Sequence, residues 1–350
     1  MVRKDNQQLT IFATRGEQPE SVHKGIAVVC NSQGDLIHAW GDPSQIIMPR
    51  STLKPLQALP LIETEAAERY KLSDAELTLA CASHRGTDDH TVSVKQWLTR
   101  LGLSENDLEC GAHPPRNEAT LHAMIRNGET PSPLHNNCSG KHAGFLTTAL
   151  HMNEPTKGYI KLEHPCQQRS IQIINEVCDI DVIQFPIGFD GCSFPVVSMP
   201  IYNLALGMAR FANPESLPKE RKHAIEQLQH AIANNPLMID GPGRFASDII
   251  TATKGSILAK SGAEGSFVAI VPQAKLGIAV KIIDGSPRAA TVALGWILQQ
   301  LDLLDQAAQN QLNEHLRPTL TNCNGIIVGH IECEKSYHEF DSRSKQQIAV

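Results

Sequence analysis

The segment SFVAIVPQAKLGIAVKIIDG, residues 266–285, contains two apolar runs around QAKLG, which predicts two β-strands joined by a short turn. GIAVVCNSQGDLIHAWGD, residues 25–42, has the same form near the N-terminus, with NSQGD as the turn. Between them, residues 51–253 show mostly helical patterns, broken by Gly, Pro and Asn clusters. Because short hairpin loops favour antiparallel pairing, we expect an α+β fold in which strands from both ends form one antiparallel sheet against a helical middle.

We expect the 350 residues to form a single domain, since no low-complexity linker or internal repeat divides them. The sheet is predicted to use about residues 9–45 and 264–332, and the helical region about 51–253. Residues 339–350 are predicted to be a loose tail.

The composition is typical of a globular protein, with 41% hydrophobic and 19% charged residues. The formal net charge of −6 argues against nucleic acid or an anionic membrane as the main partner. No apolar run approaches the roughly 18 residues of a membrane span, and no signal peptide is visible. The nine dispersed cysteines resemble reduced thiols, so we expect a cytoplasmic location.

RSTLKPLQALPL, residues 50–61, places Ser51 and Lys54 three apart at the start of a predicted helix. Residues at this spacing share a helix face, so the hydroxyl and the amine can lie together. One interpretation is a helix cap with a surface lysine. The other is a nucleophile beside its base, because a serine hydroxyl needs a base to attack.

AKSGAEGSF, residues 259–267, favours the second interpretation because it contains Lys260-Ser261-Gly262 before a late strand. An S-x-x-K pair followed by K-[ST]-G is the pattern of serine acyl-transfer enzymes of the β-lactamase type. A third polar element is needed, and it is either Ser83 in ASHRGTDDH or Ser139 with Lys141 in HNNCSGKH.

Cys138, Lys141 and Cys192 form a candidate metal or redox site. The two cysteines lie in polar, glycine-containing segments, HNNCSGKH and GFDGC. Neither belongs to a C-x-x-C pair, so the spacing alone is weak evidence for zinc, and a single cysteine is more often a buried apolar side chain.

Taken together, these segments resemble the rhizobial-type L-asparaginases, the thermolabile kind in the asparaginase II family. The likeness runs from about Arg15 to Gly329. The segments that carry it are MPRSTLKPLQALPL (48–61), CASHRGTDDH (81–90), HNNCSGKHAGFL (135–146), GFDGCSFPV (188–196), MIDGPGRF (238–245) and AKSGAEGSF (259–267). The chain lacks the G-G-T and T-D-G signatures of periplasmic-type asparaginases.

The resemblance implies a fold similar to serine β-lactamases and glutaminases, a homodimer, and hydrolysis of L-asparagine to aspartate and ammonia. It implies two Ser–Lys tandems, Ser51 with Lys54 as nucleophile and base, and Ser83 with Lys260, although Lys254 lies near Lys260 in the sequence. It further implies a zinc ion and a set of substrate-binding residues. The zinc ligands would be Cys138, Lys141 and Cys192, and the substrate-binding residues would be Arg50, His142 and Asp190.

Three alternatives remain open at this point. One is a glutaminase or a broad amidase. Another is a penicillin-recognising serine acyl-enzyme, against which the absence of S-D-N argues. The last is a non-enzymatic metal-binding module, in which the Ser–Lys pair is a helix cap only.

Overall fold

The computed structural model describes residues 4–5 and 7–334, which form two compact units. Unit 1 comprises the described residues of Met1–Thr52, Met199–Asn213 and Asp248–Val350, and unit 2 comprises Leu53–Ser198 and Pro214–Ser247. The expectation of a single domain stays a prediction. The tail predicted at residues 339–350 lies outside the described residues.

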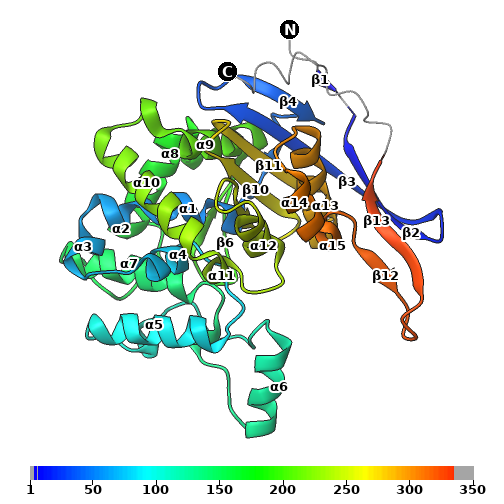
Figure 1. The fold of residues 1–350 in the computed structure, drawn as a ribbon. Coiled ribbons are helices and arrows are strands. Elements are labelled where there is room, and N and C mark those ends of the chain that lie inside the picture. The colour runs from blue at the N-terminus through cyan, green and yellow to red at the C-terminus, as the bar shows by residue number, and fades with distance from the viewer. Residues whose placement is uncertain (1–3, 6, 335–350) are drawn as a thin grey trace. The chain divides into compact units, whose positions relative to one another are not determined.

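In the described part of the chain, unit 1 is built on a nine-stranded sheet (Figure 1). The strands are β1 (Lys4–Asp5), β2 (Leu9–Arg15), β3 (Gln18–Asn31), β4 (Leu36–Trp40), β9 (Leu258–Ser261), β10 (Ser266–Val271), β11 (Leu276–Ile282), β12 (Thr319–Thr321) and β13 (Ile327–Cys333). Seven lie in the order β12-β13-β2-β3-β11-β10-β9, and β4 pairs with β3 and β1. Only the β1–β4 pair is parallel among these described strands.

The hairpin predicted from residues 266–285 is β10–β11, and β11 pairs with β3 from the other end of the chain. All six residues of β10 are buried, so both faces of the sheet are covered, since successive side chains point to opposite faces. The helices that contact β10 and β11 are α9 (Ile201–Ala212) and α13 (Pro287–Gln300). The predicted α+β class, with an antiparallel sheet drawn from both ends, is confirmed.

Two predicted boundaries were wrong. The C-terminal part of the sheet begins at Leu258 rather than near residue 264, because β9 pairs with β10. Even the Lys260 side chain of β9 is buried. The helical middle is interrupted by β6 (Ile187–Phe189) and β7 (Pro195–Val197), and the next helix, α9, begins only at Ile201. Pro195 and Pro200 lack the backbone N–H that a helix interior needs.

The remaining elements of unit 1 are short. They are β5 (Ile46–Ile47), which pairs with β8 (Met199–Pro200), the 3-10 helix Arg50–Leu53, α14 (Gln306–Gln311), α15 (Asn313–Leu316) and the Asp248–Ala252 part of α12 (Phe245–Ala252).

Unit 2 is mainly helical. Its helices are α1 (Lys54–Gln57), α2 (Leu59–Glu63), α3 (Ala66–Arg69), α4 (Asp74–Ala80), α5 (Asp88–Arg100), α6 (Glu118–Asn127), α7 (Ser139–His151), α8 (Pro165–Cys178), α10 (Lys219–Asn234) and α11 (Pro236–Ile239), with short 3-10 turns between some of them. α7 contacts α2, α3, α4, α5 and α8, and its residues 139–149 are all buried. This central helix carries Lys141 and His142 in its first turn. Within the described residues, no helix has the length and hydropathy needed to cross a membrane.

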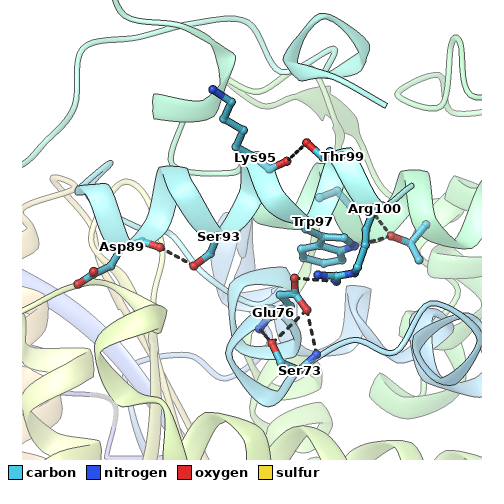
Figure 2. Close-up of polar contacts among 10 residues, drawn as sticks. Ser73, Glu76, Asp89, Ser93, Lys95, Trp97, Thr99 and Arg100 are labelled. Carbon is cyan, nitrogen blue, oxygen red and sulfur yellow. Dashed lines mark hydrogen bonds and ion pairs between the residues drawn. The ribbon is translucent and has the colours of Figure 1, made fainter. Parts of the chain in front are cut away.

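Polar contacts hold α4 and α5 to one another and to α7 (Figure 2). Ser73 caps α4 in a capping box with Glu76, whose carboxylate also pairs with Arg100 at the end of α5 at 2.8 Å. Trp97 of α5 donates a hydrogen bond from Nε1 to Thr147 Oγ1 of α7 at 3.0 Å. Because Glu76, Trp97 and Thr147 are buried, breaking either contact leaves a desolvated polar group without its bond.

Gly140 lets α7 approach the end of α4 more closely than any other residue type allows. A Cβ atom at Gly140 would lie 2.4 Å from the backbone oxygen of Leu79, whereas one at Gly144, a turn later, would make ordinary contacts of 3.4 Å and more. The two helices therefore meet backbone to backbone at the first turn of α7.

We predict that Gly140→Ala lowers the free energy of unfolding by about 2–3 kcal/mol, because one of two packed backbones must move. Gly144→Ala is the matched control, and it should be neutral or stabilising because alanine is the better helix former. Urea denaturation of both variants measures the difference. Equal stability of the two would contradict the close approach at Gly140.

Candidate active site

Ser51 lies in unit 1, on the 3-10 helix Arg50–Leu53. The residue before it, Arg50, has φ of +56°, in the left-handed region that non-glycine residues rarely adopt. Thr52 fixes this turn from the other side, because its Oγ1 donates a hydrogen bond to the Pro49 carbonyl at 2.8 Å. Such backbone strain is found where a structure holds a functional side chain in place.

Lys260-Ser261-Gly262 lies against the same turn. A Cβ at Gly262 would sit 2.9 Å from Thr52 Cγ2 and 3.0 Å from the Pro49 carbonyl oxygen, so the position requires glycine. Lys260 is 1% exposed and its Nζ donates a hydrogen bond to the Ser261 carbonyl at 2.7 Å. Lys254 is exposed, so burial favours Lys260 as the lysine of the site. Unit 1 thus brings together the Ser51 turn and the K-S-G turn.

Lys54 begins α1 in unit 2 and is 1% exposed. Its Nζ donates hydrogen bonds to the Ala82 carbonyl and, at 3.1 Å, to Ser83 Oγ. A buried amine needs such partners, because removing it from water is costly. Among the two candidates for a third polar element, this contact favours Ser83.

Ser139, the other candidate, has a structural role. Its hydroxyl donates to the Leu134 carbonyl at 3.0 Å and lies 2.8 Å from His84 Nε2. Nδ1 of His84 accepts a hydrogen bond from the Gly86 backbone, so the ring braces the loop that follows Ser83. Burial, together with His90 and Lys54, holds the pKa of His84 well below its usual value, which keeps the ring neutral.

Cys138, Lys141 and Cys192 lie together in unit 2, although no short motif joins them. Lys141 is 3% exposed, its Nζ lies 3.2 Å from Cys192 Sγ, and it stands 3.7 Å from the centroid of the Phe194 ring. The hydrogen bond with Cys192 lowers the pKa of Cys138 well below its usual value, while the pKa of Cys192 is raised. Burial acts to lower the pKa of Lys141, but the two sulfur atoms and Asp190 outweigh it and raise that pKa.

Asp190 and His142 lie beside this trio. Asp190 follows β6 in the loop to β7, and its carboxylate contributes to the pKa shifts of Cys138, Lys141 and Cys192. His142 is 0% exposed. Burial first, then Lys141 and Lys54, hold its pKa well below the usual value, while the backbone of Cys192 acts to raise it.

Comparison with known proteins decides the family. The family described as L-asparaginase II matches residues 11–333. The chain belongs to the L-asparaginase II family. The resemblance inferred from the sequence motifs is therefore confirmed, and membership of this family indicates a hydrolase. A search of curated proteins found no match.

Solved structures similar to this chain include the native form of a protein called Mglu, with 14% identity, a TM-score of 0.46, and coverage of 81% of this chain and 66% of Mglu. A β-lactamase from Mycobacterium bovis has 12% identity and a TM-score of 0.37, and the match covers 83% of this chain and 95% of that one. A class C β-lactamase from Rhodobacter sphaeroides has 15% identity and a TM-score of 0.39, and the match covers 80% of this chain and 95% of that one. For Mglu in 4.3 M NaCl the chain spans 62% of that protein's length.

Sequence reasoning missed the aromatic side chains that surround His142. Tyr159 Oη lies 2.7 Å from His142 Nδ1, and the Phe194 ring lies 4.3 Å from the His142 ring, centroid to centroid. Phe194 is two residues from Cys192 and lies in the same segment, GFDGCSFPV, so that segment could have indicated it. Tyr159 lies in a segment without any motif and gave no signal.

A second group in this family member has potential metal ligands. The ligand atoms of Glu154, His164 and Cys166 lie within 4.8 Å of one another. Glu154 pairs with Arg169 and accepts a hydrogen bond from Cys166 Sγ at 3.2 Å. Both ring nitrogens of His164 are engaged by backbone groups. Each donor atom already has a partner inside the protein, so this group is explained as a structural network.

Proposed function

We propose that this protein is an L-asparagine amidohydrolase, which releases aspartate and ammonia through an acyl-enzyme on Ser51. Besides family membership, the observation that carries the proposal is the buried amine of Lys54, held by Ala82 and Ser83 and placed three residues after Ser51. A helix cap has no need of a buried lysine, so the cap interpretation explains less of the geometry.

The hydrogen bonds of Lys54 suit a general base. A neutral amine has two N–H groups and one lone pair. If the N–H groups are used on Ala82 and Ser83, the lone pair is left to accept a proton. Ser51 Oγ attacks the side-chain amide carbon, and Lys54 takes the hydroxyl proton. That proton leaves with the amide nitrogen as ammonia, and water then hydrolyses the β-aspartyl ester.

The other two members of the proposed catalytic set are Ser83 and Lys260. We assign Ser83, through its bond to Lys54, to the transfer of protons to and from that amine. The buried ammonium of Lys260, next to the Ser51 turn in unit 1, is suited to stabilise negative charge that develops on the substrate oxygen.

We assign substrate recognition to Arg50, Asp190 and His142. A free amino acid carries an α-carboxylate and an α-ammonium at a fixed separation from its side-chain amide. Arg50 suits the carboxylate, because a guanidinium binds it with two parallel hydrogen bonds, and Asp190 suits the ammonium. His142 is fully buried, so its contribution is to the shape of the pocket rather than to open contact.

Zinc is the metal that the family resemblance implies, and the donor set fits it. Two thiols and an amine lie within one buried group, and a fourth ligand position remains for water or substrate. Cys138, Lys141 and Cys192 would hold the ion. When bound, zinc would supply a Lewis acid near the substrate. The predicted homodimer, the cytoplasmic location and the absence of nucleic-acid and membrane partners stay predictions.

We predict that Ser51→Ala folds normally but loses asparagine hydrolysis by roughly 10⁴-fold or more, as other serine nucleophiles do. Ammonia release measures this. Ser93→Ala is the matched control, because its hydroxyl bonds only to a carbonyl within α5. Turnover at the wild-type rate by a pure Ser51→Ala sample would exclude Ser51 as the nucleophile.

We predict one zinc ion per chain in the wild type and its loss in Cys192→Ala, measured by elemental analysis. Lys141 must lose its proton to bind, and its pKa is raised, so zinc affinity should fall as the pH falls. Cys178→Ala, at a buried cysteine of α8, is the control and should retain zinc. Equal zinc in the two variants would refute this ligand set.

We predict that L-asparagine is preferred over L-glutamine by about 10²-fold in kcat/KM, since one methylene displaces the amide carbon by about 1 Å when both α-groups are held. Asp190→Ala should reduce the ratio of kcat/KM for L-asparagine to that for L-glutamine, because the α-ammonium of the substrate is then no longer held. Comparable wild-type values for the two amino acids would instead indicate a glutaminase or a broad amidase. Activity only on a chromogenic penicillin analogue would indicate a penicillin-recognising enzyme.

A further inference from the structure

We propose that Tyr159 is a positioning residue, which holds His142 in the tautomer with hydrogen on Nε2 and thereby supports the loop of residues 190–194. The part that concerns kinetics rests on the proposed function. The part that concerns the tautomer does not.

The hydrogen-bond pattern around Tyr159 decides the tautomer. Its hydroxyl oxygen accepts a hydrogen bond from the Glu109 backbone N–H at 2.8 Å and lies 2.7 Å from His142 Nδ1. Tyr159 is 0% exposed, so its single O–H needs an acceptor inside the protein. His142 Nδ1 is the acceptor at hand. Nδ1 therefore carries no hydrogen, and in the neutral ring the hydrogen is on Nε2.

The His142 ring lies beside the loop that holds Asp190 and Cys192, with its centroid 4.3 Å from that of Phe194. Within the described residues Nε2 is buried without a hydrogen bond of normal geometry, but the Cys192 backbone interacts with the ring. The carbonyl oxygen is the backbone atom of Cys192 that accepts a hydrogen bond from an N–H. An N–H on Nε2 attracts this carbonyl, whereas a lone pair there would repel it.

The loop needs support from outside itself. Ser193 has φ of +71°, which costs backbone energy in a residue other than glycine. Internal bonds hold the loop together, from the Asp190 N–H to the Phe194 carbonyl at 2.8 Å and from the Ser193 N–H to the Asp190 carbonyl at 2.9 Å. The His142 ring packs on the Phe194 ring at the end of the loop, 4.3 Å between centroids, and so supports the loop from outside.

The Tyr159→Phe variant removes the O–H and leaves the ring in place. Without the donor, Nδ1 competes with Nε2 for the hydrogen, and the attraction to the Cys192 carbonyl is lost part of the time. Asp190 lies on the same loop and is assigned to substrate binding. We therefore expect KM for L-asparagine to rise roughly tenfold, as for the loss of one buried hydrogen bond, with kcat changed less than threefold.

The direct test is long-range ¹H–¹⁵N correlation spectroscopy of ¹⁵N-histidine-labelled protein. His142→Gln assigns the signal among the 15 histidines, because its resonance disappears. The wild type should show the Nε2–H pattern for His142, and Tyr159→Phe should show a mixture of tautomers. Tyr202→Phe, which loses a hydroxyl bond to the Gly34 carbonyl in unit 1, is the matched control and should keep the wild-type pattern and KM.

An Nδ1–H pattern in the wild type would overturn the proposal. This measurement needs no variant, so the proposal can be refuted even if the Tyr159→Phe protein misfolds. An unchanged tautomer in a folded Tyr159→Phe protein would also overturn it, as would an unchanged KM or a loss confined to kcat. If the wild type hydrolyses no asparagine, the proposed function fails while the tautomer result stands.

Discussion

The backbone contact between Gly140 and the Leu79 carbonyl is the constraint on which the unit 2 site depends. It brings the first turn of α7, with Lys141 and His142, against the end of α4, from which the chain continues to Ala82 and Ser83. Lys54 reaches the same place from α1. A side chain at position 140 would force one of these two backbones to move away from the other.

The second feature of the site is a pair of buried lysine amines. Lys54 and Lys141 are nearly inaccessible to water, and a charged amine removed from water is costly unless it is paired. Their partners differ in a way that matters for chemistry. Lys54 is held by a carbonyl and a hydroxyl, neither of which is charged, whereas the Nζ of Lys141 lies 3.2 Å from the sulfur of Cys192. The first set of partners suits the general base proposed above, and the second suits a metal ligand.

Much of the fold was predictable, because the decisive patterns are local. Alternating apolar runs and turn residues predicted β10–β11 and its pairing with the N-terminal strands. The CSGKH and GFDGC segments contain Lys141 and Cys192, which lie together in unit 2. The S-x-x-K segment contains the Ser51 turn, against which Gly262 packs. What failed depends on contacts distant in sequence. β9 is short, and its pairing with β10 makes it a strand. α9 begins at Ile201, directly after Pro200. Tyr159 contacts His142 only through tertiary packing, so no sequence pattern marks it.

The most direct test of the account is covalent labelling with a diazoketone analogue of L-asparagine, which alkylates the residue that attacks its carbonyl. Mass spectrometry of the digested protein then identifies the labelled residue. The account predicts one label per chain, on Ser51, with protection by L-asparagine. Labelling of Ser83 or of a cysteine in its place would contradict Ser51 as the nucleophile.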